Sequence, residues 1–133
     1  MPIATQLTLP LDNETGTLAR LCRDLAYGGV NLLAISAPET TGGERGGIRL
    51  LVINREIAVR ALSKAGYLFM ADEVLFHELT NRPGALARAV EKLAKARIDI
   101  RYAYATAAPR AKTAAAVIAV PEADLARAAK LLR

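Results

Sequence analysis

The chain has 133 residues, of which 53% are hydrophobic and 23% charged, so it can bury a core and is not expected to be disordered. Its one cysteine excludes an intrachain disulfide, which fits a reducing compartment, and one cysteine with one histidine leaves too few of the usual ligands for zinc. Residues 1–6 do not resemble a secretory signal, and the longest apolar run, Ala114–Val120, is too short to span a membrane. We therefore expect a cytoplasmic protein with no membrane segment, no metal site and no cofactor.

The net charge of +5 favours anionic partners in general, but the basic residues lie among acidic ones rather than in a single cluster. RNA-binding domains of a similar strand and helix order need stacking aromatic side chains on their third strand. The segments in that position here, residues 47–53 and 113–119, contain no aromatic residue. We therefore expect no specific binding to nucleic acid.

An internal repeat organises the chain. The segment Leu11–Arg20 aligns without a gap with Leu79–Arg88, 68 positions later, and the same offset places Val30-Asn31-Leu32 on Ile98-Asp99-Ile100. Two copies of one supersecondary unit are the simplest explanation for matches at a constant spacing.

In the first repeat, the alternation of Leu7, Leu9 and Leu11 with polar residues and proline predicts a strand. A helix follows with apolar residues at helical spacing and a glycine pair at its end, the usual left-handed stop. Two strands, a second helix and a short strand complete the pattern. The apolar residues of the first helix are Leu18, Leu21, Cys22 and Leu25, and Gly28-Gly29 ends it. The two strands are predicted at 31–37 and 47–53, on either side of a glycine-rich hairpin at 40–46. The second helix is predicted at 56–65 and the short strand at 67–70.

The second repeat is predicted in the same order. Its first helix carries Leu86, Ala89, Val90 and Leu93, and Arg97 replaces the glycine of the first repeat, so this helix should end less comfortably. The other predicted elements are a strand at 74–79, strands at 99–106 and 113–120 and a last helix at 122–132, with no clear fourth strand before Arg133. The two predicted repeats are residues 1–71 and 72–133, and residues 71–73 link the last strand of the first to the first strand of the second. Together they predict an α+β fold with helices on one face of each sheet.

The turn Asn81-Arg82-Pro83-Gly84-Ala85-Leu86, followed by Ile98-Asp99-Ile100, resembles the ACT domain family, whose members sense amino acids for metabolic regulation. The first repeat is similar but lacks the proline, since it has Asn13-Glu14-Thr15-Gly16-Thr17-Leu18. The resemblance covers almost the whole chain. It implies two tandem ferredoxin-like βαββαβ repeats.

The resemblance also implies where a ligand would lie, namely between paired domains, with the turn of one facing the start of the second strand of the other. Backbone N–H groups at a helix start suit an α-carboxylate, and a glycine in the turn permits close approach. Carried over, Asn13, Thr15, Gly16 and Thr17 would face Asp99 and Ile100, while Asn81, Pro83, Gly84 and Ala85 would face Asn31 and Leu32.

Structural roles stand beside these functional ones. Asn13 and Asn81 are also good helix N-caps, Pro83 and Gly84 also set a turn, and Asn31 and Asp99 also suit a helix-to-strand turn. His77, which aligns with Leu9, is expected to be structural, and Cys22 is expected to lie in the core.

No nucleophile with an adjacent base is visible, so we expect a binding protein rather than an enzyme. The expected partners are a free amino acid and a second copy of the chain in a homodimer. The alternative is a regulatory subunit that acts by contact with a metabolic enzyme and whose amino-acid sites are vestigial.

Overall fold

A computed structural model describes residues 3–39 and 47–133. The predicted hairpin at 40–46 lies outside the described residues. The chain folds into two compact units, an N-terminal unit of Thr5–Asp72 and a C-terminal unit that joins Ile3 and Ala4 to Glu73–Arg133. No helix in the described part is long and apolar enough to cross a membrane.

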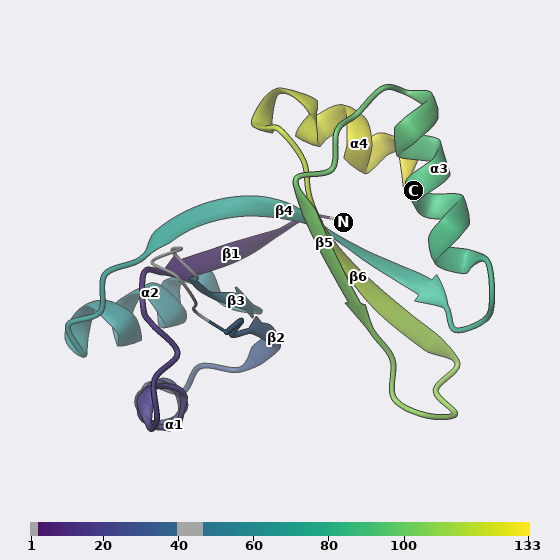
Figure 1. Cartoon of the computed structure of the whole chain (residues 1–133). Coiled ribbons are helices and arrows are strands. Elements are labelled where there is room, and N and C mark those ends of the chain that lie inside the picture. The colour runs from purple at the N-terminus through teal and green to yellow at the C-terminus, as the bar shows by residue number, and fades with distance from the viewer. Residues whose placement is uncertain (1–2, 40–46) are drawn as a thin grey trace. The chain divides into compact units, whose positions relative to one another are not determined.

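The N-terminal unit carries two helices on one face of its strands (Figure 1). Its three strands lie in the order β2-β3-β1, and both of the pairings between neighbours are antiparallel. Its elements are β1 (Ile3–Leu9, which begins in the C-terminal unit), α1 (Thr17–Tyr27), β2 (Leu32–Ser36), β3 (Ile48–Val52) and α2 (Arg55–Lys64).

The C-terminal unit repeats this plan, with its strands in the order β4-β6-β5 and two helices, α3 and α4, that contact each other (Figure 1). Its elements are β4 (Met70–Thr80), α3 (Ala85–Lys95), β5 (Tyr102–Thr106), β6 (Thr113–Ala119), a 3-10 turn (Glu122–Asp124) and α4 (Leu125–Leu131). The α+β class and the two ferredoxin-like repeats predicted from the sequence are confirmed.

Alternation along the strands explains how each unit forms its core. Leu7 and Leu9 of β1 are fully buried beneath the helices with Leu50 of β3. In the C-terminal unit Leu75 of β4 takes the place of Leu7, and Leu79 is buried at the position that matches Leu11. Ile3 packs against the core of the C-terminal unit rather than that of its own repeat. The start of the chain therefore contributes to the unit whose own sequence showed no fourth strand.

Two predicted core positions are wrong. Cys22 is exposed, because α1 buries Leu21 and Leu25 and presents the neighbouring position to solvent. Leu86 is 42% exposed, because α3 buries Ala85, Ala89 and Leu93 and its apolar face is turned by one residue from the predicted one. A helix on a sheet buries a narrow stripe, and periodicity alone does not fix which edge of a broader apolar face is covered.

Two segment boundaries also differ from the prediction. The strand expected at 67–70 is wrong for residues 67–69, which form no strand. The link expected at 71–73 lies inside β4, which runs continuously from Met70 to Thr80. The strand expected to begin at Asp99 begins at Tyr102, so Asp99 and Ile100 lie in the connection between α3 and β5.

Candidate functional site

The turns before α1 and α3 have nearly the same geometry. In the first, the Thr17 N–H donates to the Glu14 carbonyl (3.0 Å) and Gly16 has φ 86° and ψ −13°. In the second, the Ala85 N–H donates to the Arg82 carbonyl (3.3 Å) and Gly84 has φ 91° and ψ −13°. These glycine angles and the i to i+3 bond are those of a type II turn, in which only glycine is relaxed at the third position. The proline of the second turn is therefore not needed to form it.

Each turn leads directly into a helix without a side-chain cap. The N-cap residues are Gly16 and Gly84, so the reading of Asn13 and Asn81 as N-caps is wrong. Glycine has no side-chain acceptor, so those N–H groups of the first helical turn that are bonded neither within the helix nor to the turn carbonyl are left for an anion.

The side chains of Asn13 and Asn81 bind the two turns to the segments that connect β2 to β3 and β5 to β6. The Asn13 Nδ2 donates to the carbonyl of Ala37 after β2 (3.0 Å), and the Asn81 Nδ2 donates to the carbonyl of Ala111 before β6 (2.9 Å). The Asn81 N–H also donates to the carbonyl of Lys112 (2.9 Å). Both asparagines thus hold the turn in place within their own unit.

The other candidate residues lie at the opposite end of each helix. Asn31 is exposed just before β2, Leu32 is half-buried at the start of β2, and Asp99 is exposed beside the half-buried Ile100. Because α1 and α3 each have 11 residues, a helix of about 16 Å separates these groups from the turn of their own repeat. Within one unit the structure does not bring the two halves of the predicted site together.

The turns differ in charge, because position 14 is glutamate in the first and the matching position 82 is arginine in the second. An acid near a helix N-terminus competes with a bound anion, whereas a base adds to the attraction. The charge beside the Gly84 turn is therefore more favourable to an anion than the charge beside the Gly16 turn. Only the flexible end of Arg88 approaches it closely, since a Cβ on Gly84 would lie 3.1 Å from the Arg88 Nη1.

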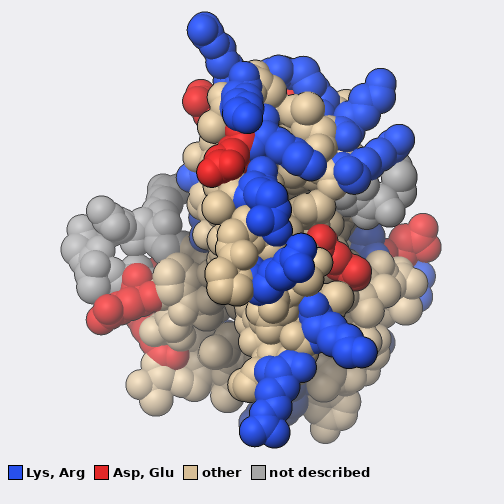
Figure 2. Space-filling model, turned by 90° about the vertical axis from the view of Figure 1, so that its right-hand side faces the viewer, with Lys and Arg blue, Asp and Glu red and all other residues tan. Residues whose placement is uncertain are grey.

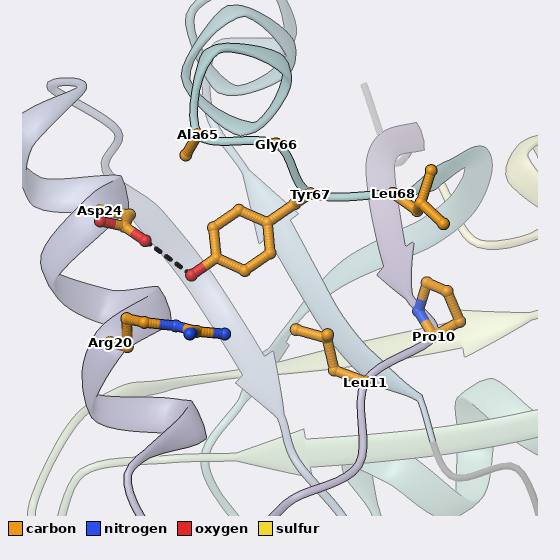
Figure 3. A pocket seen from close by; sticks show the side chains of 8 residues that line it. All are labelled: Pro10, Leu11, Arg20, Asp24, Ala65, Gly66, Tyr67 and Leu68. Carbon is orange, nitrogen blue, oxygen red and sulfur yellow. Dashed lines mark hydrogen bonds between the residues drawn. The ribbon is translucent and has the colours of Figure 1, made fainter.

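A pocket that the sequence analysis did not predict lies wholly within the N-terminal unit (Figure 3). Its volume is about 380 Å³, and it lies between α1 and the segment that connects α2 to β4. The Tyr67 hydroxyl donates to the Asp24 Oδ2 (2.6 Å) at its wall. The available sequence signal was the spacing of Arg20 and Asp24, which places both on one helix face. Nothing local links them to Tyr67.

Burial is the main cause that raises the pKa of Tyr67 above its ordinary value of 10.0, and the hydrogen bond to Asp24 raises it further. The nearby Arg20 guanidinium lowers the pKa of Tyr67 and partly offsets these effects. The hydroxyl therefore remains a proton donor at neutral pH.

No group of three or more side chains capable of holding a metal occurs among residues 3–39 and 47–133. His77 is half-buried on β4 between the core residues Leu75 and Leu79. Burial, and to a smaller degree the charge of Lys92 on α3, lowers the pKa of His77 below 6.5.

Comparison with solved structures finds the same architecture elsewhere. A protein from Bacteroides thetaiotaomicron has 27% sequence identity and a TM-score of 0.83, and the alignment covers 98% of this chain and 87% of that one. The regulatory subunit of aspartate kinase from Thermus flavus has 14% identity and a TM-score of 0.64, with 99% and 91% covered. Aspartokinase III from E. coli has 16% identity and a TM-score of 0.59, and there the alignment covers 98% of this chain but 31% of that one.

No curated protein matches the sequence. The family model described as an ACT domain pair matches residues 1–127, which include both turns, both asparagines and all six strands. The chain therefore belongs to the ACT domain family, as a pair of ACT domains.

Proposed function

We propose that this chain is a non-catalytic regulatory protein that binds a free amino acid at the turns before α1 and α3. The observation that carries the proposal is the pair of equivalent turns, each with a left-handed glycine and an uncapped helix start. The ligand carboxylate would accept hydrogen bonds from the first-turn N–H groups, and the helix dipole would add to the attraction.

The proposed sites are completed by the start of the second strand of another repeat. Asp99 and Ile100 would complete the turn formed by Asn13, Thr15, Gly16 and Thr17. Asn31 and Leu32 would complete the turn formed by Asn81, Pro83, Gly84 and Ala85. The distance along α1 and α3 supports this pairing, because a ligand at a turn cannot reach the strand start of the same repeat. Asp99 would accept from the ligand ammonium at the first site.

The proposed partner is a metabolic enzyme. The regulatory subunit of aspartate kinase from Thermus flavus has the same fold over nearly its whole length, which supports a regulatory role beside an enzyme. A structure of aspartokinase III from E. coli contains lysine and aspartate, which supports an amino acid as the class of ligand.

A thermal-shift screen against the twenty amino acids tests the proposal, because a ligand that binds the native state raises the melting temperature by mass action. Titration calorimetry then locates the site. Asp99→Asn should lower the affinity for the amino acid found in the screen by about tenfold or more, because the ligand ammonium loses a hydrogen bond to a charged carboxylate. The matched control, Glu91→Gln, removes an exposed carboxylate from α3 and should leave the affinity unchanged.

A charge exchange between the turns separates the two sites. Arg82→Glu should weaken the Gly84 site, whereas Glu14→Arg should strengthen the Gly16 site, because each change alters the charge beside a helix start. If no amino acid stabilises the protein, the turn sites are vestigial and the second candidate, regulation by protein contact alone, is favoured. The exposed apolar side chains Leu33, Ile35 and Ile53 on and beside β2 and β3 support that candidate.

A further inference from the structure

The acidic wall of the pocket is specific to the first repeat. The positions that match Arg20 and Asp24 are Arg88 and Lys92, so the second repeat keeps the basic residue but has a lysine in place of the carboxylate. A set of polar residues needed only to stabilise the fold would be expected in both repeats, since both have the same helices and strands. The difference points to a role specific to the N-terminal unit.

The polar groups of the pocket carry opposite charges on adjacent turns of α1. The Arg20 side chain extends across the pocket below the Tyr67 ring (Figure 3), and within the described residues it forms no ion pair. Its fork of N–H donors matches a carboxylate. Asp24 uses one oxygen, Oδ2, to accept from Tyr67, which leaves its other oxygen for a cationic donor.

The other lining residues, Pro10, Leu11, Ala65, Gly66 and Leu68, have no polar side chain, and Leu68 is 77% exposed. A volume of about 380 Å³ is near the lower limit for small-molecule sites, so it suits a small metabolite rather than a nucleotide. The Asp24 carboxylate disfavours a purely anionic ligand such as phosphate, and the Arg20 guanidinium disfavours a simple amine. A zwitterion satisfies both.

We infer that this pocket is a second kind of ligand site, which binds an α-amino acid with an apolar side chain. The ligand carboxylate lies on Arg20, its ammonium lies on Asp24, and its side chain covers Leu11 and Leu68. The Tyr67 hydroxyl is a positioning group, because it holds Asp24 and the connecting segment at the pocket wall. All of these residues belong to the N-terminal unit, so the site does not depend on the turn sites proposed above.

The test is an amide NMR titration of the full chain with L-leucine, 4-methylpentanoate and 3-methylbutylamine. Leucine should shift the amide signals of residues 65–68 and 20–24, and each of the two half-analogues should bind more weakly by about tenfold or more. Arg20→Gln should reduce leucine affinity to a similar degree. The matched control Arg23→Gln removes an exposed charge from the same helix and should have no effect.

Tyr67→Phe keeps the ring but releases Asp24, so it should weaken leucine binding while thermal unfolding reports whether the fold is retained. The inference is overturned if leucine does not shift these amides, or shifts only those near Gly16 and Gly84. It is equally overturned if Arg20→Gln behaves like Arg23→Gln, or if 4-methylpentanoate binds as tightly as leucine. If leucine shifts the amide signals of the pocket residues but not those near Gly16 and Gly84, that result would contradict the turn-site proposal alone.

Discussion

At the residue scale, the role of a side chain can be inferred by comparing the residues at matching positions of the two repeats. His77 occupies the position of Leu9, which is fully buried. Its neighbours on the same strand face, Leu75 and Leu79, belong to the core, so the imidazole is held where its charged form is disfavoured. Lys92 on α3 adds like charge.

Replacing His77 with leucine should therefore remove a pH dependence of stability. Because the pKa of His77 is lowered in the fold, the neutral side chain is favoured there, and its contribution is fully present above 6.5. As pH falls below 6.5, the unfolded chain takes up the proton first and this contribution is lost. Urea unfolding of wild type and His77→Leu on both sides of 6.5 measures the effect. An unchanged pH slope in the variant would contradict it.

At the scale of single elements, α1 and α3 both end on a residue with positive φ, but that residue is a glycine after α1 and an arginine after α3. After α1, Gly29 has φ 74° and the Val30 N–H donates to the Leu25 carbonyl (2.9 Å). After α3, Arg97 takes φ 58° and the Ile98 N–H donates to the Leu93 carbonyl (3.0 Å). The expectation that the second helix ends less comfortably is confirmed, because a side chain is strained in the left-handed region.

Arg97→Gly should therefore stabilise the protein by about 1 kcal/mol, since relief of the left-handed strain exceeds the entropy that glycine adds to the unfolded chain. The reciprocal change, Gly29→Arg, should destabilise it by a similar amount. Denaturant midpoints of both variants give the comparison. Equal midpoints for wild type and Arg97→Gly would show that the hydrogen bonds of this helix end fully offset the strain.

At the scale of the whole molecule, charge is divided unequally between the two halves of the chain. Residues 73–133 carry 11 Lys and Arg against 6 Asp and Glu, whereas residues 1–72 carry 7 of each. The whole excess of +5 thus lies in the second half, and Figure 2 shows a face on which Lys and Arg outnumber Asp and Glu. The basic residues lie among acidic ones in both halves, but the excess of basic residues is confined to residues 73–133.

Despite this asymmetry we expect no sequence-specific binding to nucleic acid, because β3 and β6 carry no aromatic side chain for stacking on bases. Any binding to RNA or DNA should be weak, indifferent to sequence and lost as salt is added. Fluorescence anisotropy with two unrelated oligonucleotides over a salt series checks this. A complex that keeps its affinity and prefers one sequence at physiological salt would refute it.

The outer strand of the N-terminal unit, β2, exposes Leu33 and Ile35 on one face. Unpaired strand edges beside apolar side chains are usually covered, and closed two-fold dimers are the commonest homo-oligomers. We expect light scattering at micromolar concentration to give twice the chain mass of 14.2 kDa. Leu33→Lys should lower the mass toward one chain, and a wild type that is already monomeric would exclude this assembly.

The sequence by itself determined the repeat, the order of the elements and the glycines of both turns. Each of these depends on local properties, namely alternation along strands, the spacing of apolar residues along helices and the angles that only glycine adopts comfortably. The ACT resemblance came from the same local signals and the family match confirms it.

Only the tertiary structure decided which face of each helix is buried, and with it the exposure of Cys22 and the burial of Ala85. It also decided that Asn13 and Asn81 bind hairpin carbonyls, that Ile3 packs in the C-terminal unit, and that Tyr67 meets Asp24. The physical reason is the same in each case. These contacts join residues that are from 24 to more than 60 positions apart, so local periodicity does not determine them.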